Sequence, residues 1–192
     1  MDNFIEEFLG YMNLLNLLAM SENAKITQDM VQNITGFLKY KFARKGEIVT
    51  LKEELIYIEK LIDMFVRRFG NNLEFTRNLE DGTTDLYIPN YTLLAFVENA
   101  LFHGFIPKEG IWKLTLEVKI IEKGIQIKIT DNGVGFKTNN LELSKNSDEK
   151  YGSIPNVRLR LQNYFGNDNI VNISSMNDKG TIVYIHIPGA NY

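Results

Sequence analysis

The sequence predicts an α+β fold, in which a helical segment precedes a mixed, mostly antiparallel sheet covered by helices on one face. The first 70 residues repeat apolar side chains every three or four positions, as amphipathic helices do. After them, strand-like alternation is interspersed with two further helical stretches. Helices and sheets that each present one apolar face bury it by packing in layers. We therefore expect a helical segment at 1–70 and a sheet-containing domain at 71–192.

The expected helices of the first region are at 3–20, 30–42 and 51–69. Residues 21–27 are polar and typical of a turn. The third helix has a defined start, because Thr50 followed three residues later by Glu53 forms a capping box. Amphipathic helices cannot bury their faces singly, so these form a bundle within the chain or with a second copy. We favour dimerisation, because the helices precede a compact region of different character.

The second region is expected to hold strands at 73–79, 84–88, 112–121, 125–130, 170–174 and 181–187, and helices at 93–104 and 156–165. Pro89 and Asn90 open the first of these helices, since proline is confined to the entry side of helices. Residues 136–151 are polar and aperiodic. A loop this long in a compact domain is usually functional.

Composition excludes several classes of function. The 192 residues carry a net charge of −3 with both signs dispersed, which argues against a nucleic-acid-binding face. Cysteine is absent and there are two histidines, so thiol chemistry and histidine-rich metal sites are excluded. No apolar run approaches the roughly 20 residues that span a bilayer, and the acidic start is no signal peptide. We expect a cytoplasmic chain, or the cytoplasmic portion of a membrane-bound sensor whose membrane segments lie elsewhere.

One stretch, Leu93 to Gly104, predicts a buried helix that carries the polar pair Glu98-Asn99. Burying a carboxylate and a carboxamide is unfavourable unless a polar or ionic group meets them. A functional site and a core helix with one polar edge remain equally good interpretations of this stretch alone.

A second signal is Asp131-x-Gly133-x-Gly135, which follows a strand. A carboxylate at a strand end can accept a hydrogen bond from an exocyclic amino group such as that of adenine. Glycines just after it let the backbone pass close to a flat ring. Taken alone, however, Asp-Asn-Gly is better explained as an ordinary turn.

As an ordered set, the motifs resemble the ATP-binding domain of the GHKL superfamily, with its Bergerat fold, and in particular the LytS/YesM type of sensor histidine kinase. The resemblance runs from about residue 10 to residue 188. The matching motifs are Leu51-Lys52-Glu53-Glu54-Leu55, Arg68-Phe69-Gly70, Ile88-Pro89, Val97-Glu98-Asn99-Ala100, His103-Gly104, Asp131-Asn132-Gly133-x-Gly135, Tyr164-Phe165-Gly166 and Gly180-Thr181-x-Val183-x-Ile185-x-Ile187-Pro188.

This resemblance implies that ATP and Mg²⁺ are bound and that phosphoryl transfer to histidine follows. Asn99 would hold Mg²⁺ while the ion bridges the phosphates. Glu98 would act as a general base or orient the receiving group, its alternative being a surface glutamate beside the site. Asp131 would contact the adenine amino group, supported by the Thr181 hydroxyl. Gly133 and Gly135 would make room for the base.

The resemblance also implies that 1–70 is a dimerisation or phosphotransfer-like segment and that 71–192 is the ATP-binding domain. It further implies an ATP lid at 136–155, which includes Gly152, and a response regulator as a partner. His103 falls on the phosphate side of the pocket, where a capping role is as plausible as ligand contact. Asn156 would present backbone N–H groups to phosphate. Arg158 and Arg160 are better explained as a solvated face.

The chain departs from the family pattern at three places. No histidine precedes His103, and Phe8-Leu9 stand where the family has Pro-His, so the usual phosphoacceptor is missing. In the lid, either Ser153 replaces a glycine or two residues are missing, and Phe102 stands where many relatives have lysine. Two alternatives therefore stay open beside a working histidine kinase: a pseudokinase that acts as a dimeric regulatory switch, and a GHKL ATPase of another class.

Overall fold

The computed structural model describes residues 2–43, 46–70, 72–136, 154–167 and 170–189. The helices are α1 (Asp2–Ser21), α2 (Lys25–Leu38), α3 (Leu51–Phe69), α4 (Leu93–Asn99) and α5 (Ile154–Phe165), with π-helical segments η1 (Lys39–Ala43) and η2 (Ala100–Phe105) continuing α2 and α4. The strands are β1 (Ile48–Thr50), β2 (Leu73–Leu79), β3 (Tyr87–Pro89), β4 (Trp112–Ile121), β5 (Gly124–Asp131), β6 (Val171–Met176) and β7 (Gly180–Pro188).

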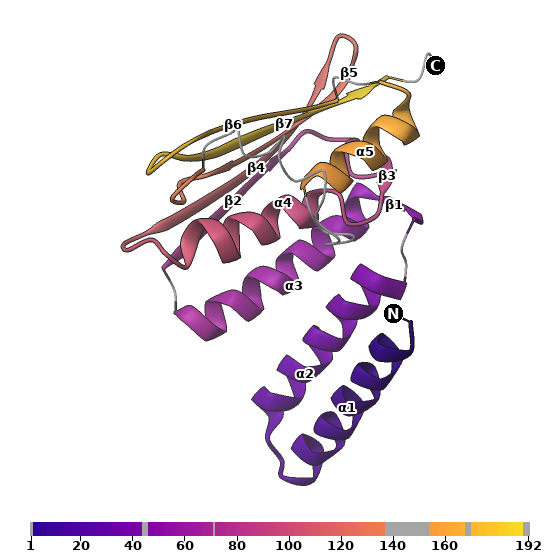
Figure 1. The fold of residues 1–192 in the computed structure, drawn as a ribbon, viewed down its shortest axis with the longest axis vertical. Helices are drawn as coiled ribbons and strands as arrows, with labels where there is room; N and C mark the ends of the chain where they lie inside the picture. The colour runs from indigo at the N-terminus through magenta and orange to yellow at the C-terminus, as the bar shows by residue number, and fades with distance from the viewer. Residues whose placement is uncertain (1, 44–45, 71, 137–153, 168–169, 190–192) are drawn as a thin grey trace.

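The main sheet has the strand order β2-β4-β5-β7-β6. β2 and β4 are parallel, and every other neighbouring pair is antiparallel. The layer of α3, α4 and α5 lies against one face of this sheet (Figure 1). The mixed sheet covered by helices on one face is thus confirmed.

α3 shares one hydrophobic core with α4 and the sheet, while α1 and α2 form a hairpin on the far side of α3 (Figure 1). The third helix therefore packs mainly with the region that follows it in sequence. Its bounds agree with the prediction, and its capping box is present, with the Glu53 backbone N–H donating to Thr50 Oγ1 at 3.2 Å. Local side-chain bonding at the first turn explains why this boundary could be predicted.

Residues 84–88 do not form the strand that alternation predicted. β3 is limited to Tyr87–Pro89 and pairs with β1, outside the main sheet. The carbonyls of Leu86 and Thr84 instead accept the backbone N–H groups of Leu51 and Lys52, at 2.8 and 2.9 Å. The segment thus satisfies free donors at the start of α3, a long-range role that its own pattern does not encode.

The start of α2 differs from the prediction. α2 begins at Lys25, because the turn is confined to the residues around Asn23, which adopts a left-handed φ of 53°. α4 begins at Leu93, as the expected range 93–104 has it, although Pro89 and Asn90 lie before the helix and do not open it. No helix in the described part of the chain is long and apolar enough to cross a membrane.

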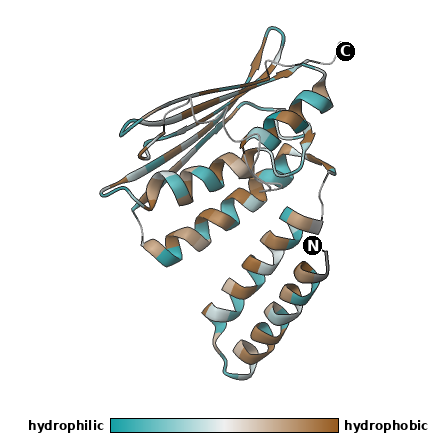
Figure 2. Ribbon diagram, in the orientation of Figure 1, coloured by the Kyte–Doolittle hydropathy of each residue, from teal (hydrophilic) through white to brown (hydrophobic). Residues whose placement is uncertain are grey.

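The apolar side of α1 is largely uncovered in the single chain. Figure 2 shows hydrophobic stretches along this helix, and its large apolar side chains include Tyr11, Leu14, Leu17 and Leu18, which expose 61%, 58%, 60% and 57% of their surface. A monomer therefore leaves this helix incompletely packed.

Candidate nucleotide site

Glu98 and Asn99 are the first polar residues of α4, a helix that is otherwise deeply buried. Every residue of α4 from Leu93 to Val97 is buried, whereas Glu98 and Asn99 are half-buried. The helix continues as η2 to Phe105, so Gly104 lies one residue before its end. Both polar residues therefore belong to the less buried end of α4.

Asp131 is the last residue of β5 and is 6% exposed. Its Oδ1 accepts the Gly133 backbone N–H at 2.8 Å. Thr181, its register partner on β7, donates to it from both backbone and hydroxyl. Burial raises the pKa of Asp131 above the ordinary aspartate value of 3.8, while these hydrogen bonds and Lys108 lower it. The result is a buried carboxylate held by backbone and hydroxyl donors, for which an amino group is a favourable further partner.

The glycines after Asp131 allow backbones to pass closely. A Cβ on Gly133 would lie 2.6 Å from Cα of Gly104, and the Val134 N–H donates to the Gly104 carbonyl at 2.9 Å. Gly135 has a φ of 62°, and a Cβ there would lie 2.2 Å from the Met176 carbonyl oxygen. These contacts join the end of η2 to the end of β5, bringing the two predicted motifs to one site.

Ser175 is a site residue that sequence reasoning missed. It is the register partner of Thr181 on β6, and the two hydroxyl oxygens lie 3.0 Å apart. Its Oγ accepts the backbone N–H of Phe136, the first residue of the predicted lid, at 2.9 Å. Only the pairing of β6 with β7 reveals this placement, because no local motif surrounds Ser175.

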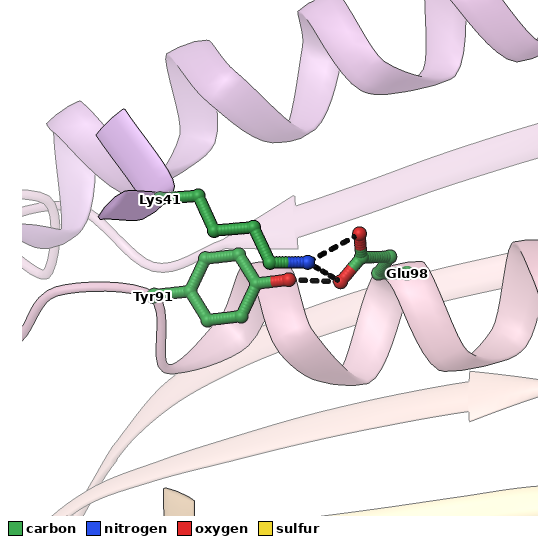
Figure 3. Close-up of polar contacts among 3 residues, drawn as sticks. All are labelled: Lys41, Tyr91 and Glu98. Carbon is green, nitrogen blue, oxygen red and sulfur yellow. Dashed lines mark hydrogen bonds and ion pairs between the residues drawn. The ribbon is translucent and has the colours of Figure 1, made fainter. Parts of the chain in front are cut away.

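Glu98 is bonded on both carboxylate oxygens (Figure 3). Lys41 Nζ, from η1, lies 2.9 and 3.0 Å from them, and the Tyr91 hydroxyl donates to one of them. Lys41 Nζ also lies 4.9 Å from the centroid of the Tyr91 ring. Burial, then the Glu98 charge, raises the pKa of Tyr91, so its hydroxyl stays a donor. In this arrangement Glu98 joins the helical hairpin to α4.

Lys41→Ala is expected to destabilise the fold by about 1–3 kcal/mol, because it removes a charged partner from a largely buried carboxylate. The Lys41 and Glu98 side chains expose 18% and 21% of their surface. Lys25→Ala is the matched control, since Lys25 Nζ also lies 2.9 Å from a carboxylate, that of Asp29, but the pair is 74% and 43% exposed. Chemical denaturation should show a loss near zero for Lys25→Ala. Equal losses in the two variants would contradict the importance of the Lys41–Glu98 contact.

The remaining predicted site residues differ in their burial and packing. His103 is exposed on η2, and Asn156 is half-buried in the first turn of α5. Phe102 packs edge-on against Phe65 of α3, with ring centroids 5.8 Å apart. Gly152 and most of the predicted lid lie outside the described residues.

Asn99 is suited to a magnesium ion that is held mainly by phosphate groups and water. In the described parts of the chain, no three or more His, Cys, Asp and Glu side chains gather as a metal-binding group. Mg²⁺ commonly takes one or two protein oxygens and completes its shell with phosphates and water. The half-buried amide of Asn99 is suited to supply one such oxygen.

Comparison with known proteins gives matches in both regions of the chain. A family model described as "Histidine kinase" matches residues 8–73. The sensor histidine kinase YesM of Bacillus subtilis is 28% identical over 177 residues, covering 92% of this chain and 30% of that protein. The sensor protein LytS of the same organism is 28% identical over 181 residues, with the same coverage. The chain is thus similar to sensor histidine kinases of the LytS/YesM type.

Solved structures resemble this chain in fold. The catalytic domain of the histidine kinase ThkA superposes with a TM-score of 0.52 at 14% identity, covering 75% of this chain and 97% of that one. The Acinetobacter baumannii histidine kinase AdeS gives a TM-score of 0.51 at 14% identity, covering 90% and 84%. The chain thus shares the fold of histidine kinase catalytic domains. It spans about 30% of the length of the curated proteins quoted.

Proposed function

We propose that this chain is the ATP-binding catalytic portion of a two-component sensor histidine kinase, and that it transfers the γ-phosphoryl group of ATP to a histidine. The observation that supports this most is the buried Asp131 carboxylate, backed by Gly133 and Thr181 and joined through Gly104 to the Glu98-Asn99 helix. The similarity to YesM and LytS supports the same reading.

In this proposal, Asp131 accepts a hydrogen bond from the adenine amino group, and Thr181 holds the carboxylate in place. Asn99 supplies one oxygen to Mg²⁺, which when bound neutralises phosphate charge and aligns the γ-phosphoryl group. His103 and the N-terminus of α5 near Asn156 lie toward the phosphates. Glu98 orients the receiving imidazole once Lys41 has moved away from it.

The phosphoryl acceptor is proposed to be a histidine outside this chain. No histidine precedes His103, and Leu9 of α1 stands where the family has its acceptor. Leucine has no nucleophilic nitrogen, so it cannot take the place of the acceptor histidine. A response regulator is the proposed final recipient, and the cytoplasmic side of a membrane-bound sensor is the proposed location. The relatives quoted are named as sensors or kinases, which gives no specific support to the regulatory-switch or ATPase alternatives.

An assay with labelled ATP and Mg²⁺ tests this proposal. The chain is incubated alone and with a separately produced relative that carries the histidine in its first helix, and bound nucleotide, acid-labile phosphoprotein and free phosphate are scored separately. We expect nucleotide binding in both cases and acid-labile label on the relative only. Binding without label on the relative would favour a regulatory switch, and phosphate release without label would favour an ATPase.

We also propose a homodimer formed through the uncovered face of α1. Leu18→Glu is expected to convert the dimer to a monomer, because a carboxylate in that interface would lose its hydration. Leu159→Glu is the matched control, since Leu159 is also an exposed helical leucine, at 55% against 57% for Leu18, but lies on α5. Sedimentation equilibrium measures the mass. A monomeric parent chain, or a dimer that survives Leu18→Glu, would contradict this interface.

A further inference from the structure

Glu54 of α3 is a carboxylate that the nucleotide site does not use directly, yet it is completely buried, with 0% of its surface exposed. All of the partners the structure assigns to it are hydrogen-bond donors. Its Oε1 accepts the Tyr40 hydroxyl and the Tyr91 backbone N–H. Its Oε2 accepts the backbone N–H groups of Leu93 and Leu94, at 2.9 and 3.0 Å. Two donors on each oxygen occupy the full acceptor capacity of an ionised carboxylate.

Three of these four donors belong to the start of α4. The first turn of a helix has backbone N–H groups without partners in the helix, and a side chain at the N-cap position usually accepts one. Here the N-cap residue Thr92 makes no such bond, because its hydroxyl donates to the Pro89 carbonyl at 2.6 Å. Glu54 takes over this task from a different helix. Its negative charge also lies at the positive end of the α4 dipole.

The opposite end of the same helix carries the residues of the nucleotide site. Asn99 lies six positions after Leu93, about 9 Å further along the helix axis. A short buried helix moves as a unit, so a shift or rotation at Leu93 is carried to Asn99. Metal and phosphate sites respond to such displacements strongly, since misplacement by about 1 Å can cost about a hundredfold in rate.

We propose that Glu54 is a positioning residue for the Mg²⁺-nucleotide site: by accepting the first N–H groups of α4 it fixes the helix in the place where Asn99 meets the metal. The inference rests on the proposed function. Tyr40, at the end of the α1–α2 hairpin, donates to the same carboxylate, so the position of α4 also depends on where that hairpin docks.

Glu54→Gln is the sharpest test, because it keeps the shape of the side chain and replaces one acceptor oxygen by a donor. At least two of the four bonds are then lost, with donors facing donors. Calorimetry should show that the gain in ATP affinity on adding Mg²⁺ falls by about tenfold, as for other residues that orient metal ligands. Metal-free ADP should bind within about twofold of wild type, because Asp131 is not moved. In amide hydrogen exchange, Leu93 and Leu94 should exchange faster than in wild type.

Glu53→Gln is the matched control, since the same change is made one residue away, in the capping box of α3. It should leave both affinities and the exchange of Leu93 and Leu94 unchanged. If Glu54→Gln retains the wild-type Mg²⁺ gain, or weakens metal-free ADP equally, Glu54 is only structural and the inference is overturned. If Glu54→Gln does not fold, Glu54→Asp, which keeps the charge but withdraws it by one methylene, should lose part of the Mg²⁺ gain; a full gain would overturn the inference.

Failure of the proposed function gives a distinguishable result. If the wild-type chain binds no Mg²⁺-nucleotide, the proposed function falls whatever the variants do. The positioning of α4 by Glu54 is then decided by the amide chemical shift of Asn99 in Glu54→Gln. An unchanged shift overturns the inference, and a displaced one supports it.

Discussion

Asp131→Asn is expected to weaken ATP binding by about ten- to a hundredfold, the loss associated with a hydrogen bond to a charged group. The carboxylate presents acceptor oxygens only, and Asp131 already uses one for the Gly133 N–H. An asparagine in its place must point either its amide nitrogen or its single oxygen at the adenine amino group, with Gly133 and Thr181 competing for that oxygen. Titration calorimetry with ATP and Mg²⁺ measures the change.

The same substitution is expected to stabilise the fold at neutral pH. Burial raises the folded-state pKa of Asp131 above the ordinary value of 3.8, so the folded chain holds this proton more tightly than the unfolded chain. The stability that the protonated group contributes is present below pH 3.8 and is lost as the pH rises through the folded-state pKa. Asparagine does not titrate, so the advantage of the variant should grow through this pH window and persist above it.

Asp85→Asn is the control for both effects, because it removes an exposed carboxylate from the loop before β3. It should change neither ATP affinity nor the pH dependence of unfolding. A substitution that weakens ligand binding but stabilises the fold, as expected for Asp131→Asn, is typical of a residue kept for function. A variant that binds ATP like the parent would refute the adenine role of Asp131.

Asn99→Ala is expected to abolish the gain in ATP affinity that Mg²⁺ provides, while metal-free ADP binds as in the parent chain. The amide oxygen is the protein ligand proposed for the ion, and alanine offers none. Its helix should persist, because alanine is a strong helix former and Asn99 is only half-buried. Phosphoryl transfer to a partner histidine should fall below detection.

Asn163→Ala provides the matched comparison, since Asn163 is an exposed asparagine within α5. Binding should be measured at several Mg²⁺ concentrations for both variants. A Mg²⁺ dependence that survives Asn99→Ala would assign the metal to another residue.

Local patterns predicted much of the fold. The capping box at Thr50 gave α3 its observed start, and alternation gave the β4–β5 and β6–β7 pairs. Prediction failed at residues 84–88, because their carbonyls serve the start of α3, far away in sequence. Strand-like alternation does not reveal the partner that a segment will find.

The difference between local patterns and distant partners also explains which residues of the candidate site could be predicted. Asp131 and Glu98-Asn99 were found because each lies in a short motif. Glu54 also lies in a short motif, but that motif assigns it no role, and its burial became evident only from the donors of α4. Likewise, Lys41 lies 57 residues from Glu98 in sequence, and nothing near it indicates a partner.

The central claim, that Asp131 lies in an adenine pocket, is tested most directly by comparing ATP with GTP in one calorimetric titration series with Mg²⁺. Adenine presents an amino donor where guanine presents a carbonyl oxygen, which a carboxylate repels. The wild-type chain should bind ATP and reject GTP, and Asp131→Asn should lose much of that preference. Equal binding of the two nucleotides, or no binding of either, would contradict the claim.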